Sequence, residues 1–209
     1  MSNYANKYSQ NGEEAVILET LAALGIEKGH LVDLGAGDGI TMSNSRALLD
    51  KGWTGDLYDG DPKGAKDVSE AWIDLKWTRK TARKCDFLNI DLDGNDIHIL
   101  HEWLRFDCPG PALIVAEINP IFQRHEKAYI PYNEAHVWGN DTYYGMSLAA
   151  CEKLANDYAY TLMHLHAGIN AFLLRNDHAK AHPELIRPIE YRQKFDHKPH
   201  PAGKPWTTL

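Results

Sequence analysis

The chain has few of the features that mark membrane, secreted or nucleic-acid-binding proteins. Its three cysteines, Cys85, Cys108 and Cys151, are odd in number and share no metal-type spacing, which is typical of a reduced, cytoplasmic protein. No apolar run approaches the ~20 residues that a membrane span requires. The first residues carry neither a basic region nor an apolar core, so we expect no secretion signal. The formal net charge of −7 counts against a broad nucleic-acid surface, because Lys and Arg drive phosphate binding.

What is present fits one α/β domain. The 209 residues suffice for a single domain, which we place at residues 1–177, followed by a polar arm at 178–209 that is rich in Pro and His. The arm could wrap the domain or join a second copy, so a homo-oligomer stays open.

Strand and helix patterns alternate along the chain. Repeated strand-then-helix units predict a parallel sheet covered by helices on both faces. Between residues 62 and 84 there is room for only an abbreviated third strand, or for none. Apolar runs predict strands at about 30–35, 55–59, 87–92, 113–118, 160–165 and 169–174. Spacings of three and four predict helices at about 13–24, 43–51 and 146–158, and Leu100, Trp103 and Leu104 give an inner face to a further helix after the 87–92 strand.

The most informative segment is Gly35-Ala36-Gly37-Asp38-Gly39, directly after the first predicted strand. Glycines at such a bend let a ligand lie against the main chain, where a Cβ would collide with it. The spacing differs from the Gly-x-Gly-x-x-Gly of dinucleotide enzymes, and Asp33 and Asp38 place negative charge where a pyrophosphate cradle avoids it. This pattern favours a cationic, phosphate-free nucleoside, and S-adenosylmethionine fits it. The alternative is an ordinary glycine-rich turn without a ligand.

Asp59, a second acid, supports the hypothesis that the glycine turn binds a nucleoside. Asp59 ends the second predicted strand, 20 positions after Gly39. A carboxylate at about this separation accepts hydrogen bonds from ribose hydroxyls in nucleoside-binding βαβ units. Asp61 is a near alternative for the same role.

Five segments together resemble the FkbM-like branch of class I methyltransferases: YSQNGEEAVILETL, LVDLGAGDGITMSNSRALL, GWTGDLYDGDP, FLNIDLDGNDIHIL and INAFLLRND. The resemblance implies a Rossmann-like sheet, mostly parallel with an antiparallel closing strand. It also implies an S-adenosylmethionine-dependent enzyme that methylates hydroxyl groups of sugars or related small molecules. The positions that match cofactor-binding positions of the family are Asp33, Gly35, Gly37 and Asp59, and Gln10 and Glu13 match its short motif before the first strand.

Three carboxylates follow the central strand: Asp91, Asp93 and Asp96. Crowded acids are costly unless a cation or hydrogen-bond donors offset their repulsion. One hypothesis is a Mg²⁺ site that uses Asp91 or Asp93. Another makes Asp91 or Asp93 a cofactor contact, or Asp93 a general base. The structural alternative has Asp96 capping the next helix and Asp91 satisfied by backbone donors.

A second polar group follows the next strand. Glu117 and Asn119 would lie beside Asp91 and Asp93 if strands adjacent in sequence are adjacent in the sheet, which makes them candidate metal ligands and Glu117 a catalytic candidate. Among the 11 histidines, His125 is the candidate base, because an unperturbed imidazole has a pKa near ~6.5.

Residues 119 to 145 form the longest connection and are rich in aromatic groups. We expect a substrate lid suited to a sugar; the alternative is a loop that packs on its own rings. The string Asn119-Pro120-Ile121-Phe122 resembles the Asn-Pro-Pro-Tyr motif of methyltransferases that act on flipped adenine, but it lacks the second proline. We therefore favour a small-molecule O-methyltransferase over a nucleic-acid amino-methyltransferase. A non-catalytic cofactor-binding or assembly protein with the same fold is the alternative from another class.

Overall fold

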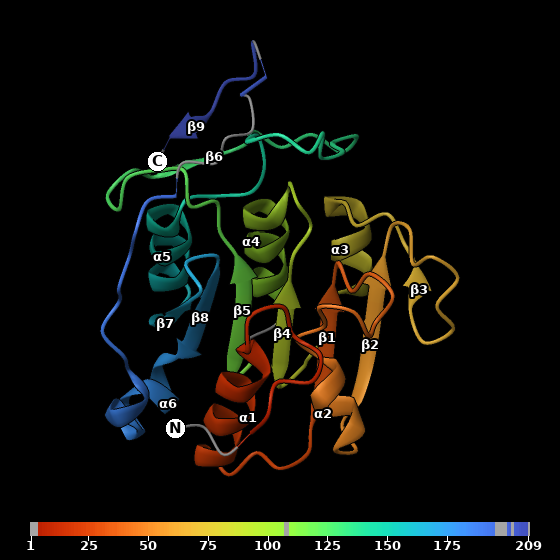
Figure 1. Ribbon diagram of the computed structural model, residues 1–209, viewed down its shortest axis with the longest axis vertical. Helices are drawn as coiled ribbons and strands as arrows, with labels where there is room; N and C mark the ends of the chain where they lie inside the picture. Colours follow the sequence, from red (N-terminus) through yellow and green to blue (C-terminus); the bar gives the residue numbers. More distant parts are fainter. Residues whose placement is uncertain (1–3, 107–108, 195–199, 202, 209) are drawn as a thin grey trace.

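The computed structural model describes residues 4–106, 109–194, 200–201 and 203–208, and shows a seven-stranded sheet between two layers of helices (Figure 1). The strand order is β3-β2-β1-β4-β5-β8-β7, which begins as the order of a doubly wound nucleotide-binding sheet. β8 is antiparallel to both of its neighbours, and the other strands run parallel to one another. The predicted fold class is therefore confirmed. The strands are β1 (His30–Leu34), β2 (Thr54–Asp59), β3 (Ser69–Glu70), β4 (Phe87–Ile90), β5 (Leu113–Glu117), β7 (Tyr160–His166) and β8 (Asn170–Arg175).

Alternating residues of the central strands divide the core into two halves. Phe87 pairs in register with Leu31 and Leu113, and all three belong to one buried apolar cluster. Their neighbours Leu88 and Ile114 belong to the other. Helices α1 (Glu13–Ala23), α2 (Arg46–Asp50) and α6 (Asn176–Ala181) cover the first face, and α3 (Leu75–Thr81), α4 (Asp96–Phe106) and α5 (Leu148–Asp157) cover the second (Figure 1). Burial on both faces explains why these strands read as continuous apolar runs.

Two short elements flank β2. The helix expected at 43–51 begins only at Arg46, because the Ser43 hydroxyl accepts the amides of Ser45 and Arg46 and Met42 has a positive φ of 57°. The third strand is present but abbreviated to two residues. Asp74 then starts α3 by accepting the Trp77 amide at 2.6 Å.

The carboxyl ends of the parallel strands point toward the top of Figure 1, where a small second sheet lies above them. It pairs β6 (Ala128–Tyr129) with β9 (Thr207–Thr208). Between α6 and β9 the chain passes a short 3₁₀ helix, Pro183–Leu185, and climbs beside the domain (Figure 1). There the Tyr191 hydroxyl donates to the Pro120 and Phe122 carbonyls. The described part of the arm therefore packs on the start of the long connection.

Among the described residues, none of the helices combines the length and the apolar composition needed to cross a bilayer. Cys85 and Cys151 are buried, and Cys108 lies outside the described residues.

Candidate functional site

The glycine turn after β1 is anchored to both neighbouring strands. The amides of Gly35 and Ala36 donate to the Tyr58 carbonyl at 2.9 and 3.0 Å. Gly35 has a φ of +90°, and a Cβ there would lie 1.7 Å from the Asp91 carbonyl oxygen. The close approach between the turn and the end of β4 therefore requires a glycine at position 35. We had expected the glycine to make room for a ligand instead.

Gly37 is the glycine that faces open space. Its φ is +57°, and an added Cβ would meet nothing within 4 Å. Its amide donates to Asp59 Oδ2 at 2.8 Å, while Asp59 Oδ1 accepts the Asp61 amide at 2.7 Å. The predicted pairing of the turn with the acid that ends β2 is thus a direct contact.

Asp33 lies beneath the turn and is buried. Asn89 donates to its Oδ1 at 2.8 Å, and Asn44 donates to Asn89 at 3.0 Å. Burial raises the pKa of Asp33, and the Asn89 hydrogen bond opposes that shift. With Gly35 and Gly37, Asp33 lines a cavity of about 100 Å³.

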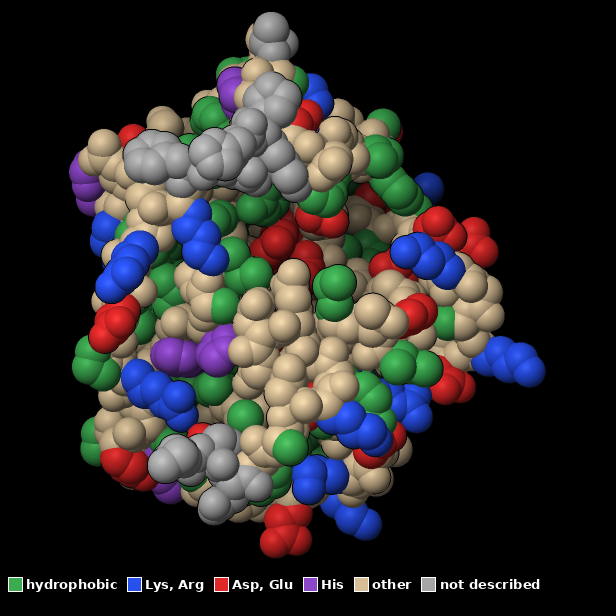
Figure 2. Space-filling view, viewed as in Figure 1, with side chains coloured by type: hydrophobic (Ala, Val, Ile, Leu, Met, Phe, Trp, Pro, Cys, Tyr) green, Lys and Arg blue, Asp and Glu red, His purple; other side chains and the backbone are tan. Residues whose placement is uncertain are grey.

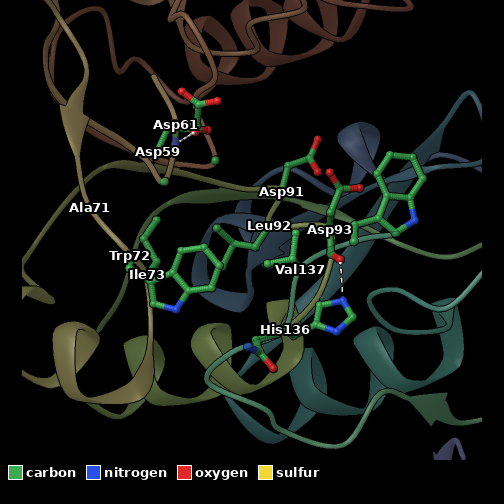
Figure 3. A pocket seen from close by; sticks show the side chains of 14 residues that line it. Asp59, Asp61, Ala71, Trp72, Ile73, Asp91, Leu92, Asp93, His136 and Val137 are labelled. Atoms are coloured by element: carbon green, nitrogen blue, oxygen red, sulfur yellow. Dashed lines mark hydrogen bonds between the residues drawn. The ribbon is translucent and has the colours of Figure 1, made fainter. Parts of the chain in front are cut away.

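A larger cavity of about 400 Å³ opens beside the turn (Figure 3). Its walls come from four places: the β2 end with Asp59 and Asp61, residues 71–73, the β4 end with Asp91 and Asp93, and residues 136–138 of the long connection. Its described lining includes neither Lys nor Arg. Figure 2 shows acidic side chains gathered in a hollow in the upper half of this face. The site therefore disfavours phosphate groups and favours cationic ligands.

Beside this cavity, which Asp91 and Asp93 line, the ends of β4 and β5 bring three acids together. One carboxylate oxygen from each of Asp91, Asp93 and Glu117 lies within 4.8 Å of the other two, and Figure 3 shows Asp91 and Asp93 side by side. Glu117 Oε2 is shielded from solvent and accepts no N–H or O–H hydrogen bond from the described residues. Burial, followed by repulsion from neighbouring acids, raises the pKa of Asp91 and of Glu117. We call these three residues the acidic cluster.

Asp96 behaves differently from the acidic cluster. It lies in the first turn of α4, where its carboxylate accepts the amides of Leu92 at 2.8 Å and Gly94 at 2.9 Å. These bonds close the turn between β4 and α4. Asp96 therefore has a structural role, as in the alternative hypothesis that it caps the helix.

Two predicted residues lie away from the cluster. The Asn119 side chain is buried and donates to the Thr142 and Tyr144 carbonyls, both at 3.0 Å, so it joins the two ends of the long connection rather than facing the acids. His125 is exposed and lines a separate depression with Phe122 and Trp206. The structure thus does not place Asn119 as a metal ligand or His125 as a base.

The residues of the N-terminal motif also lie outside the described lining of both cavities. Gln10 is exposed. Glu13 is buried and accepts hydrogen bonds from the Asn11 amide at 2.8 Å and from the Asn170 side chain at 3.0 Å. The bond with Asn170 joins α1 to β8. Glu13 therefore lies against the sheet and not in the cavity.

The histidine that reaches the cavity is His136 of the long connection, whereas the sequence favoured His125 as the candidate base. The Nε2 atom of His136 lies 3.2 Å from the Asp93 carbonyl (Figure 3). Burial lowers the pKa of His136, so the imidazole is neutral at pH 7, and a donated Nε2–H leaves Nδ1 as a free acceptor. The composition of residues 119 to 145 pointed to a lid, but composition does not tell which of its side chains turns inward.

The segment that carries His136 is fixed on both sides of the cavity. Trp72 Nε1 donates to the Glu134 carbonyl at 2.6 Å. Asn95 and Asn133 exchange two hydrogen bonds, at 2.8 and 3.2 Å. Residues 133–138 are therefore held in place on both sides of the cavity, and residues 136–138 line it.

No protein-family model and no curated protein sequence matches the chain. Among solved structures, it is similar to a 1,6-didemethyltoxoflavin-N1-methyltransferase of Burkholderia thailandensis with bound S-adenosylhomocysteine (12% identity, 78% of this chain and 76% of that chain, TM-score 0.47). It is also similar to a magnesium protoporphyrin IX methyltransferase of Synechocystis PCC 6803 with bound S-adenosylmethionine (13% identity, 78% and 77%, TM-score 0.47). A third is an S-adenosylmethionine-dependent methyltransferase of Clostridium acetobutylicum (10% identity, 79% and 92%, TM-score 0.46).

Proposed function

We propose that this protein is an S-adenosylmethionine-dependent methyltransferase that acts on a hydroxyl group of a small molecule. The observation that carries the proposal is the contact between Gly37 and Asp59 at the edge of an acidic cavity whose described lining includes no Lys or Arg. That arrangement offers a carboxylate suited to ribose hydroxyls, but no phosphate partner among the described lining residues.

The residues present fit S-adenosylmethionine. A cavity of about 400 Å³ is within the usual size of small-ligand sites. Asp59 would hold the ribose, the open side of Gly37 would receive the methionine portion, and Ile73 and Leu92 would flank the adenine. Acidic walls attract a ligand that carries a sulfonium and an ammonium group. When bound, the cofactor supplies a methyl group on a positively charged sulfur.

The chain's own contribution is positioning and proton removal. Holding acceptor and donor in contact supplies most of the rate in such transfers. His136 Nδ1 is suited to accept the proton of the acceptor hydroxyl. Asp93 and Glu117 are the alternatives for this role, since a raised pKa makes the Glu117 carboxylate a stronger base.

For the acceptor, we propose a saccharide or a similar polyol. Trp138 offers a flat apolar face on the same wall as His136, and Asn95 adds a polar group to the lining. Sugars are bound in this way, with rings against apolar faces and hydroxyls on polar groups. The motif resemblance to FkbM-like enzymes points to the same acceptor class.

The non-catalytic alternative drew on the short connection between residues 62 and 84. In the structure this connection still supplies Ala71, Trp72 and Ile73 to the cavity wall. Its brevity therefore does not leave the site open on that side, and we favour the enzyme.

The test is calorimetric titration with S-adenosylhomocysteine, followed by mass spectrometry of a glycan and small-metabolite panel incubated with the methyl donor. We expect saturable binding, loss of at least about tenfold in affinity in Asp59→Ala, and unchanged affinity in the control Asp67→Ala, whose side chain is 76% exposed. Absence of binding by the folded protein would contradict the proposal. Binding without methylation of any acceptor in the panel would favour the non-catalytic alternative.

A further inference from the structure

The main cavity has exposed apolar side chains next to its acidic lining. Trp72 and Val137 line the cavity, and they are 51% and 69% exposed (Figure 3). Apolar surface left in water costs free energy, and an exposed apolar patch on a folded protein often marks the place where a ligand binds. The described residues include five exposed large apolar side chains, and three of these line the main cavity or the small one beside it: Met42, Trp72 and Val137.

Trp72 is fixed in its exposed position. Its Nε1 donates to the Glu134 carbonyl at 2.6 Å, and its six-membered ring lies against Gly60, where an added Cβ would be 3.3 Å from Trp72 Cε3. These contacts hold Trp72 between the loop after β2 and the long connection, but they leave half of the residue in solvent. Trp103, by contrast, is fully buried in the core. A ring that is fixed before a ligand arrives loses little entropy when the ligand packs on it.

Val137 belongs to the same fixed part of the wall. It lies three residues after Glu134, whose carbonyl binds Trp72. Its neighbour His136 packs closely on Gly94, where an added Cβ would collide with the imidazole. Trp72 and Val137 therefore offer a positioned apolar surface, which we call the apolar rim.

The lining beside the apolar rim determines which charge a ligand can carry. It includes the carboxylates of Asp59, Asp61, Asp91 and Asp93, and no Lys or Arg is among the described lining residues. An anionic ligand such as a fatty acid or a sugar phosphate would be repelled here. Hydroxyl groups fit, because carboxylates accept hydrogen bonds from them. The cavity therefore suits a molecule with an uncharged, hydroxylated end and an apolar end.

We propose that the apolar rim binds the apolar substituent of an uncharged glycoside, whose sugar hydroxyls lie among the acidic lining residues. Calling this glycoside the methyl acceptor rests on the proposed function, whereas its binding does not. A sugar without the substituent would contact only the polar lining and would bind more weakly. Trp72 and Val137 would then select the acceptor without taking part in proton removal, the role proposed for His136.

The test compares three ligands by calorimetric titration of the full-length protein: octyl β-D-glucoside below its micelle-forming concentration, methyl β-D-glucoside and octyl β-D-glucuronide. We expect the octyl glucoside to bind at least about tenfold more tightly than the methyl glucoside, because each buried methylene favours binding. The glucuronide keeps the octyl chain but adds a carboxylate, so it should bind at least about tenfold more weakly than the octyl glucoside. A smaller ratio in either comparison would overturn the proposal, as would no binding of the octyl glucoside.

Two variants test whether the apolar rim makes the difference between the two glucosides. Val137→Thr keeps the shape of the side chain but adds a hydroxyl, and Trp72→Ser removes the indole. Each should lower the octyl-to-methyl affinity ratio by at least about threefold. An unchanged ratio in both variants would overturn the proposal.

The affinity ratio also separates apolar contact from a structural role. Trp72→Ser removes the bond to the Glu134 carbonyl, but a displaced wall would weaken both glucosides alike and leave their ratio unchanged. The control is Phe106→Ser, which removes an aromatic side chain of similar exposure, 54%, at the end of α4 and outside the cavity lining. Its ratio should equal that of the wild type. A ratio lowered as much in Phe106→Ser as in the rim variants would overturn the assignment to the rim.

Titration of the same samples with S-adenosylhomocysteine distinguishes this proposal from the proposed function. A rim-dependent preference for octyl glucoside without nucleoside binding would support the glycoside site and remove the methyltransferase. Nucleoside binding without that preference would remove the glycoside site and leave the proposed function. Weaker nucleoside binding in Trp72→Ser with an unchanged glucoside ratio would place Trp72 at the cofactor and overturn its role in the rim.

Discussion

The two halves of the candidate site treat their acidic residues in opposite ways. At the ends of β1 and β2, Asp33 accepts an amide hydrogen bond from Asn89, and Asp59 accepts main-chain bonds from Gly37 and Asp61. At the ends of β4 and β5, the acids of the cluster face one another, and Glu117 Oε2 accepts no N–H or O–H hydrogen bond from the described residues. The acids of the first half are held by hydrogen bonds, whereas the acids of the second half lie close enough to repel one another.

This difference distinguishes acids that stabilise the fold from acids that are kept for a ligand. Satisfied acids stabilise the turn that they hold, so their removal lowers the free energy of unfolding. Unsatisfied acids cost stability, and proteins keep such costs mainly at functional sites. The four substitutions below test this contrast by the sign and the size of their effects.

The largest effect is expected at Gly35, where the two halves touch. A Cβ in Gly35→Ala would lie 1.7 Å from the Asp91 carbonyl oxygen, so the turn and β4 must move apart. We expect a loss of about 3 kcal/mol or more in the free energy of unfolding, measured by urea denaturation. Gly37→Ala is the matched control, because its Cβ meets nothing, and should lose only about 1–2 kcal/mol from its positive φ. Equal losses in the two variants would contradict the packing described for this turn.

The next effect concerns Asp96, the satisfied acid beside the cluster. Asp96→Asn replaces one of the two accepting oxygens with an NH₂ group, which cannot accept the amides of Leu92 and Gly94 together. We expect a loss of about 2 kcal/mol in the free energy of unfolding, from the same denaturation experiment. An unchanged stability would show that these two bonds do not hold the turn.

Asp59 should affect ligand affinity more than stability. In Asp59→Asn the remaining carbonyl oxygen can still accept the Gly37 amide, but the charge that would hold two ribose hydroxyls is lost. We expect about tenfold weaker binding of S-adenosylhomocysteine, or about 1.4 kcal/mol, by calorimetry. A shift in unfolding with no change in affinity would make Asp59 a structural residue.

The smallest effect is a gain. The raised pKa of Glu117 means that ionising its buried carboxyl costs stability as the pH rises, so Glu117→Gln, which keeps the shape without the charge, should make the protein more stable by about 1 kcal/mol at alkaline pH. For a domain of this size that is about 2–4 °C in the thermal midpoint, measured by differential scanning fluorimetry in the presence of a chelator. A lower midpoint would mean that the Glu117 carboxylate is satisfied and that the two halves do not differ.

The sheet and the glycine turn were predictable because local pattern determines them. Strands buried on both faces read as apolar runs, as Leu31 to Leu34 and Leu113 to Ala116 show. The spacing of Gly39 and Asp59 reflects one strand–helix–strand unit, which brings its two ends together whatever the rest of the chain does. The neighbours β4 and β5 likewise bring Asp91 and Glu117 together.

The long connection was not predictable at the level of single residues. Its path depends on contacts with distant segments: Trp72 binds the Glu134 carbonyl, and β6 pairs with β9 near the end of the chain. These contacts turn His136 into the cavity and leave His125 on the surface. Asn119 carries the oxygen of a metal ligand, but its side chain closes the base of this connection instead.

The most direct measurement is a crystal structure of the protein with S-adenosylhomocysteine. We predict the ribose hydroxyls on the Asp59 carboxylate and the homocysteine chain along the open side of Gly37. A nucleoside bound elsewhere on the protein, or a cavity that stays free of ligand in a crystal soaked at saturating concentration, would contradict the account.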